Sequence, residues 1–201
     1  MPRAARDLVS DLHALLQTAH VPGPYVFAAH SFGGIFARLY ASTYPSEIVG
    51  MVLVDALSEK VRTGLTPEQW KLYVNFGFTK PTPGLEKYED IETLDVNANL
   101  DEMEKAASAE PLRPMPLFVL TQGQSFDLSP WQPLPADFPG ALDKGWHTSQ
   151  DALATLAPNA KHKIATKSSH YIQAQEPQLV IGGIKQVVEA VRNPSAWTTA
   201  P

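Results

Sequence analysis

The chain has 201 residues, enough for one domain that buries its own hydrophobic core. A formal net charge of −5 makes nucleic acid and anionic membranes poor partners, and the lack of cysteine excludes disulfides, thiolate nucleophiles and cysteine-ligated metals. We expect neither a metal nor a cofactor. No apolar run approaches the roughly 18 residues of a membrane span, and no apolar segment follows the first six residues, so we expect a cytoplasmic protein.

Apolar runs between turn residues indicate buried strands, and apolar residues at helical spacing indicate helices. In chain order the sequence predicts a helix over 6–19, a strand over 25–29, a helix ending near Tyr44, strands over 48–54 and 117–120, a helix ending before Pro158, a weak strand over 163–166 and a helix opening at Pro177. Strands that alternate with helices pair in parallel through right-handed crossovers. We therefore expect a three-layer α/β fold with a mostly parallel sheet of about four strands.

The stretch over 58–110 differs from the rest because it contains no convincing strand. Thr66-Pro67-Glu68-Gln69 predicts a helix start, with Thr66 as the N-cap and Gln69 completing a capping box. Residues 86–110 carry nine of the 21 acidic side chains and predict a solvated helical face. We interpret 58–110 as a helical cap inserted into a core formed by 1–57 and 111–201, and the proline-rich 126–140 as a loop.

Ser31 follows the first predicted strand and precedes a helix. Small residues at Ala29 and Gly33 permit a sharp turn there, which exposes the hydroxyl above the carboxyl end of the sheet. The turn also directs the Phe32 N–H and the helix N-terminus toward a developing oxyanion. The alternative is a small residue that a strand–helix turn merely tolerates; the context favours a nucleophile.

His170 lies between the last predicted strand and the last helix, at the same edge of the sheet as Ser31. A neutral imidazole at that place can accept the serine proton and return it to a leaving group. None of the other five histidines is better placed. His30 is next to Ser31 in the chain, but we expect its side chain to point away from it.

Several segments together resemble the α/β-hydrolase superfamily, most of all its esterase-like bacterial members. They are Ala28-Ala29-His30-Ser31-Phe32-Gly33-Gly34, Ala37-Arg38-Leu39-Tyr40-Ala41, Val52-Leu53-Val54-Asp55 and Ser169-His170-Tyr171-Ile172-Gln173. The resemblance implies a serine hydrolase with a triad in the chain order Ser, acid, His, and it places the insertion as the cap. Serine at position 31 argues against relatives that carry Asp there, such as epoxide hydrolases.

The resemblance leaves the triad acid open between two positions. Most relatives carry it after the strand predicted at 117–120, where Asp127 is the nearest acid. Some carry it after the strand next to the serine's, where Asp55 lies. By analogy we favour Asp55, with Asp127 as the alternative, to orient His170 and stabilise its imidazolium form.

Aromatic residues of the cap and the proline-rich loop are candidates for an apolar substrate pocket. They are Trp70, Tyr73, Phe76 and Trp131, with Phe78 and Phe126 nearby. The alternative for any one of them is that it packs the cap onto the core.

The resemblance also implies several strands before the helix at 6–19, and the sequence contains none, so the N-terminal half is incomplete relative to the family. Two expectations follow. A loop after one of those strands normally supplies a second oxyanion N–H, which leaves Phe32 as the one assured donor. The strand at 25–29 becomes an unpaired edge, so we expect a homo-oligomer formed through it.

These points favour a carboxylesterase-type serine hydrolase acting on short- to medium-chain esters through an acyl-enzyme on Ser31. The alternative is a catalytically impaired relative that serves as a binding or oligomerising module. Intact Ser31 and His170 speak for the first, and the missing oxyanion segment speaks for the second.

Overall fold

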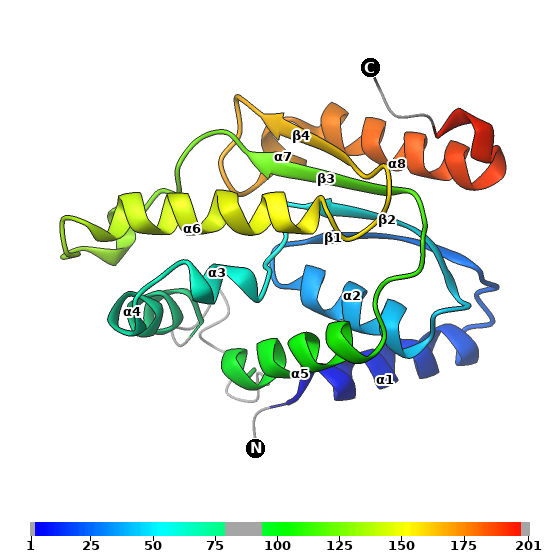
Figure 1. Ribbon diagram of the computed structural model, residues 1–201, viewed down its shortest axis with the longest axis horizontal. Coiled ribbons are helices and arrows are strands. Elements are labelled where there is room, and N and C mark those ends of the chain that lie inside the picture. The colour runs from blue at the N-terminus through cyan, green and yellow to red at the C-terminus, as the bar shows by residue number, and fades with distance from the viewer. Residues whose placement is uncertain (1–2, 79–93, 198–201) are drawn as a thin grey trace.

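A computed structural model describes residues 3–78 and 94–197 and shows a four-stranded parallel sheet at the centre of the molecule (Figure 1). The strands lie in the order β1-β2-β3-β4, and all three neighbouring pairs are parallel. They are β1 (Tyr25–His30), β2 (Ile48–Val54), β3 (Leu117–Gln122) and β4 (Lys161–Ala165). Their carboxyl ends therefore meet at one edge of the sheet, as the alternating pattern predicts.

Helices cover both faces of the sheet. They are α1 (Ala5–Thr18), α2 (Gly33–Thr43), α3 (Lys60–Thr63), α4 (Pro67–Phe78), α5 (Val96–Ala109), α6 (Phe138–Leu153), α7 (Ile172–Gln175) and α8 (Pro177–Arg192), with 3₁₀ turns η1 (Ser129–Trp131) and η2 (Pro194–Ala196). In Figure 1, α8 lies on one face, whereas α2 and α6 lie on the other. The predicted three-layer α/β class is confirmed.

Two apolar clusters hold these layers together. Val187 of α8 packs against Val52 and Phe118 on one face of the central strands. On the other face, α2 and α6 bury larger side chains, of which Ile35 and Trp146 are almost inaccessible to solvent. Burial of roughly 25 cal/mol per Å² of apolar surface makes these two clusters the main stabilising contribution.

The described part of 58–110 contains α3, α4 and α5, and the assignment of this stretch as a cap stays a prediction. Thr66 and Gln69 form the predicted capping box, in which Thr66 Oγ1 accepts from Gln69 N and Gln69 Oε1 accepts from Thr66 N. Asp95 caps α5 by accepting from Ala98 N. α5 packs against α1 and α2 and thus extends the helical layer of the core (Figure 1). Residues 79–93, including part of the predicted acidic face, lie outside the described residues.

The structure differs from the sequence-based elements in several places. β1 ends at His30 and β3 at Gln122, one and two residues beyond the predicted ends. β4 begins at Lys161, two residues before the predicted start. The predicted loop over 126–140 contains η1, and α6 begins inside it at Phe138. Pro139 lies in the first turn of α6, where a residue needs no N–H because no helical carbonyl is available to accept from it. α7 has only four residues, too few for a periodic pattern. In the described ranges, no helix is long and apolar enough to cross a membrane.

Candidate active site

Ser31 occupies a sharp turn between β1 and α2. Its φ of 53° lies in the left-handed region, which few residues other than glycine adopt without strain. Its carbonyl accepts from Gly34 N at 3.0 Å and from Leu57 N at 2.7 Å, so the turn is tied both to its own helix and to the segment after β2. A Cβ at Gly34 would lie 2.5 Å from Ala56 Cβ, which is why the second residue of the helix has no side chain.

Asp55 follows β2 directly and is fully buried. Its φ of 43° is also left-handed and turns the side chain above the end of the sheet. Oδ1 accepts from Gln122 N at 2.9 Å and from Trp146 Nε1 at 3.0 Å. These two donors compensate a buried carboxylate oxygen that would otherwise lose its hydration.

His170 lies in the loop after β4, and its ring lies between Ser31 and Asp55. Its Nδ1 is 2.7 Å from Asp55 Oδ2, and its Nε2 is 2.8 Å from Ser31 Oγ. An ionised carboxylate can only accept, so Nδ1 carries the proton and Nε2 of the neutral ring is free to accept from the serine hydroxyl. The structure thus brings Ser31, His170 and Asp55 into one chain of hydrogen bonds.

Asp127 lies outside this chain of hydrogen bonds. Its side chain is exposed, and Oδ1 accepts from Ser129 N at 3.0 Å. Hydrogen bonds from Ser129 hold the pKa of Asp127 below its usual value. Of the two acids that the sequence left open, the structure places Asp55 and not Asp127 beside His170.

Phe32, the predicted oxyanion donor, immediately precedes α2 and already has helical dihedrals, with φ −60° and ψ −26°. The first N–H groups of a helix find no partner within it, and the helix dipole adds partial positive charge there. The Phe32 N–H therefore sits one residue from the Ser31 hydroxyl, at a helix end that suits an anion.

Comparison with known proteins is consistent with this geometry. The sequence profile of the alpha/beta hydrolase family matches residues 2–182. The chain belongs to the alpha/beta hydrolase family.

The three similar proteins described next are 27% identical to this chain or less. YqjL, an uncharacterized protein of Bacillus subtilis (strain 168), is 27% identical over 180 residues, covering 89% of this chain and 62% of YqjL. The chain thus spans less than two thirds of that relative. A thermophilic esterase from Thermogutta terrifontis matches with a TM-score of 0.60 at 16% identity, over 95% of this chain and 74% of the esterase. A carboxylesterase structure from Nitrososphaera gargenis gives 0.57 at 11%, over 96% and 74%. At these identities the two structures share a fold with this chain.

The predicted pocket residues of this alpha/beta hydrolase divide into two groups. Trp70 is 9% exposed, and its Nε1 donates to Asn97 Oδ1 at 2.8 Å, so it fastens α4 to α5. Tyr73 is buried, with its ring 5.4 Å from that of Trp70. Burial, together with the negative Asp55, raises the pKa of Tyr73 above its usual value, which keeps the phenol neutral. The packing alternative describes Trp70 well.

The second group extends toward the serine. Phe76 stacks on Trp131 with ring centroids 5.6 Å apart and an interplanar angle of 14°. Phe78 reaches furthest, because its ring is 5.4 Å from the ring of Phe32. The ring of Phe126 lies 5.3 Å from the imidazole of His170.

Two contacts of this alpha/beta hydrolase were missed by sequence reasoning. The first is made by His30, whose Nε2 is 2.8 Å from the carbonyl oxygen of His170. Trp146 supplies a donor to Asp55 from the middle of a helix, where its spacing indicated only a core residue. No local pattern marks either contact, since each joins segments at least 91 residues apart.

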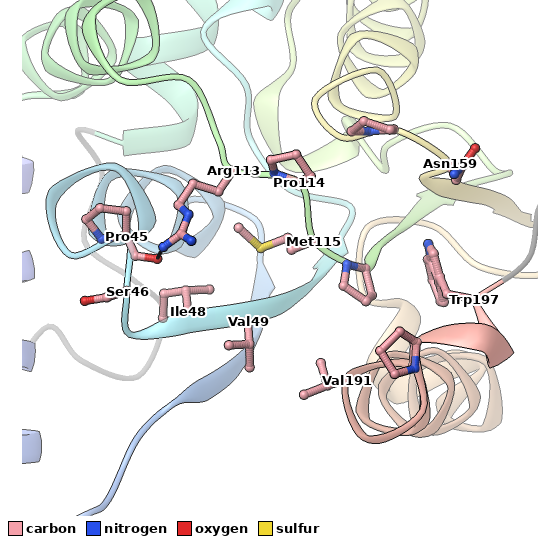
Figure 2. A pocket seen from close by; sticks show the side chains of 14 residues that line it. Pro45, Ser46, Ile48, Val49, Arg113, Pro114, Met115, Asn159, Val191 and Trp197 are labelled. Atoms are coloured by element: carbon pink, nitrogen blue, oxygen red, sulfur yellow. Dashed lines mark hydrogen bonds between the residues drawn. The ribbon is translucent and has the colours of Figure 1, made fainter.

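The other end of the sheet carries a pocket of a different kind (Figure 2). Its volume is about 540 Å³, and it lies at the amino-terminal ends of β2, β3 and β4, away from Ser31. Arg113 Nη1 donates to Pro45 O there at 3.2 Å. Within residues 3–78 and 94–197, no group of three or more His, Asp or Glu side chains is arranged to hold a metal ion.

Proposed function

We propose that this protein is a serine hydrolase that cleaves carboxylic esters through an acyl-enzyme on Ser31. One observation carries the proposal: the unbroken hydrogen-bond chain from Ser31 Oγ through His170 to Asp55, at 2.8 and 2.7 Å. This is the arrangement by which a base activates a serine and a buried acid orients the base.

In the first half of the reaction, Ser31 Oγ attacks the ester carbonyl carbon while its proton passes to His170 Nε2. The carbonyl oxygen becomes an oxyanion, which the Phe32 N–H stabilises. When the tetrahedral intermediate collapses, the bond to the alkoxy oxygen breaks, and Nε2 returns the proton to the departing alcohol. The product is an ester between the acyl group and Ser31.

In the second half, water attacks the acyl-enzyme with His170 Nε2 as the base. The new tetrahedral intermediate collapses to a carboxylic acid, and the proton returns to Ser31 Oγ. Throughout, Asp55 holds the proton on Nδ1 and stabilises the imidazolium that forms in each half. Its two further donors, Gln122 N and Trp146 Nε1, fix the carboxylate in place.

The substrate class follows from the surroundings of Ser31. The aromatic ring of Phe78 lies against Phe32, next to Ser31, and that of Phe126 lies against His170, which favours an apolar acyl or alcohol group. We propose short- to medium-chain esters, bound between these rings and the pair Phe76 and Trp131.

The test is a panel of p-nitrophenyl esters of increasing acyl length. The wild type should hydrolyse the shorter members, whereas Ser31→Ala and His170→Ala should lose at least about 10³-fold in kcat. Ser46→Ala, which alters a serine in the pocket at the other end of the sheet, is the matched control and should behave as wild type. Unchanged hydrolysis by Ser31→Ala would refute the proposal.

A second candidate function, a catalytically impaired relative that binds or oligomerises, rests on the edge of the sheet. β1 is the terminal strand of the described sheet. A groove of about 390 Å³ runs beside it, lined by Leu12, Phe27 and Phe36 among others. Because an unpaired strand edge pairs readily with another chain, we propose that a second copy of the protein adds its own β1 there.

Sedimentation velocity at micromolar concentration tests this association. We expect a dimer, and Ala28→Lys, which places a charge at an exposed position of β1, should shift it to monomer. A clean monomer for the wild type would contradict the association. A dimer that hydrolyses no ester on the panel would favour the second function over the first.

A further inference from the structure

His30 is the last residue of β1 and directly precedes Ser31. Its side chain lies against the loop that carries His170: the two ring centroids are 4.5 Å apart, and that of Tyr171 is 5.6 Å away. His30 Nε2 is 2.8 Å from the carbonyl oxygen of His170. The residue that leads into the serine turn therefore also touches the backbone of the base.

The direction of this hydrogen bond follows from its partner. A carbonyl oxygen can only accept, so Nε2 of His30 must carry a proton and donate it. Burial, and next the neighbouring His170, lower the pKa of His30 below its usual value. The ring is therefore neutral near pH 7, with its single proton on Nε2.

Two hydrogen bonds then act on His170 from different sides. Asp55 holds the ring at Nδ1, and His30 holds the main chain at the carbonyl. The ring is bonded at Nδ1 to Asp55 and at Nε2 to Ser31, and the bond from His30 adds a contact to the main chain that limits rotation of the backbone carrying the ring. Because Ser31 belongs to the same turn as His30, the bond also ties the base to the segment that carries the nucleophile.

The neutrality of His30 matters to the same chemistry. Proton transfer from Ser31 leaves an imidazolium on His170, and a second cation with its ring centroid 4.5 Å away would oppose that charge. A neutral donor at this place supplies the hydrogen bond without the repulsion.

We propose that His30 is a positioning residue that holds His170 in line with Ser31 by donating from Nε2 to the His170 carbonyl. This inference rests on the proposed hydrolase function. It assigns His30 no contact with substrate, so its effect should fall on kcat and not on KM.

Two substitutions separate the hydrogen bond from the bulk of the ring. His30→Phe keeps an aromatic ring but removes the donor, and should lower kcat for p-nitrophenyl acetate roughly 10- to 100-fold with KM little changed. His30→Gln keeps an N–H at the place of Nε2 and should recover most of that loss. His162→Phe is the control, because His162 Nε2 bonds to Thr121 Oγ1 in the same sheet; its kcat should equal that of the wild type.

A second measurement does not depend on activity. The proton on His170 Nδ1, in its short bond to Asp55, should give a far-downfield ¹H resonance in the wild type and in His30→Gln. In His30→Phe the resonance should shift or broaden by exchange, while thermal melting shows that the variant is folded.

The outcomes separate the two proposals. An unchanged kcat and resonance in His30→Phe, or equal losses in His30→Phe and His30→Gln, would overturn the positioning role. A wild type that hydrolyses no ester of the panel would overturn the hydrolase proposal, and the resonance would still report whether His30 positions His170.

Discussion

The two ends of the parallel sheet carry different kinds of feature. At the carboxyl ends, Ser31, Asp55 and His170 come from three different segments and join in one hydrogen-bond chain. At the amino ends, a pocket of about 540 Å³ is lined mainly by apolar side chains (Figure 2). A pocket is one sign of a binding site, whereas convergent titratable groups, which lie at the carboxyl end, are a sign of a catalytic one.

The difference begins with the backbone. Ser31 and Asp55 follow adjacent strands, and both adopt left-handed dihedrals that turn their side chains above the sheet. Of the 14 residues that line the amino-end pocket, five are prolines: Pro45, Pro114, Pro116, Pro158 and Pro194. Proline has no N–H to offer a polar substrate. The arginine that lines this pocket, Arg113, already donates to a backbone carbonyl.

The largest expected effect tests whether the catalytic acid must belong to the hydrogen-bond chain with Ser31 and His170, or need only lie at the carboxyl end of the sheet. Asp55→Asn should lower kcat by about 10⁴-fold, because an amide can donate to Nδ1 and so favours the tautomer whose Nε2 cannot accept from Ser31. Asp127→Asn alters an acid at the same end of the sheet that lies outside the hydrogen-bond chain, and its kcat should stay close to that of the wild type. Steady-state kinetics on p-nitrophenyl acetate measure both.

The opposite outcome for the two acids would change the assignment of the catalytic acid. If Asp127→Asn lost the activity and Asp55→Asn kept it, the loop after β3 would have to move toward His170 during the reaction, and the buried acid would be structural. Equal and small losses in both variants would remove the acid from the mechanism.

These two acids also show how far a sequence can go. The alternation of apolar runs and turn residues predicts the order of the elements, and the strand–turn–helix context singles out Ser31 and His170. The choice of acid depends on which carboxylate faces His170 across 115 residues of chain, and only analogy favoured Asp55. The bond from His30 to the His170 carbonyl was not predicted for the same reason, since its partner is 140 residues away.

Glycines near the two ends of β2 give the next contrast. A Cβ at Gly34 would lie 2.5 Å from Ala56 Cβ, between the serine turn and the segment after Asp55. A Cβ at Gly50 would lie 2.5 Å from Val187 Cγ1 of α8. Overpacking of this kind costs about 1–3 kcal/mol of unfolding free energy, so Gly34→Ala and Gly50→Ala should both lower the midpoint in urea.

Activity should separate the two glycine variants. Gly34→Ala pushes the serine turn away from Asp55 and should reduce kcat about tenfold or more, because small displacements of reacting groups are costly. Gly50→Ala disturbs only the packing of α8 on the sheet and should keep its kcat while folded. A loss of kcat in Gly50→Ala would mean that the geometry of the site depends on the whole of β2.

The smallest expected effect concerns two tryptophans, one at each end. Trp146 Nε1 donates to Asp55 Oδ1 at 3.0 Å, whereas Trp197 Nε1 is buried at the amino-end pocket without a hydrogen-bond partner among the described residues. Trp146→Phe should lower kcat about tenfold, since a hydrogen bond to a charged group contributes roughly 1.5–3 kcal/mol and Gln122 N still holds the same oxygen. Trp197→Phe removes an N–H that bonds to nothing described and should leave kcat unchanged.

Kinetics and urea titrations of both variants compare the two ends of the sheet directly, because the same Trp→Phe substitution is made at each end. Each variant loses some packing area, so a small drop in stability is common to both and does not distinguish them. The distinguishing quantity is kcat measured on the folded protein. A lower kcat in Trp197→Phe would couple the amino-end pocket to the chemistry, whereas an unchanged kcat in Trp146→Phe would show that Gln122 N alone suffices to hold the buried carboxylate against His170.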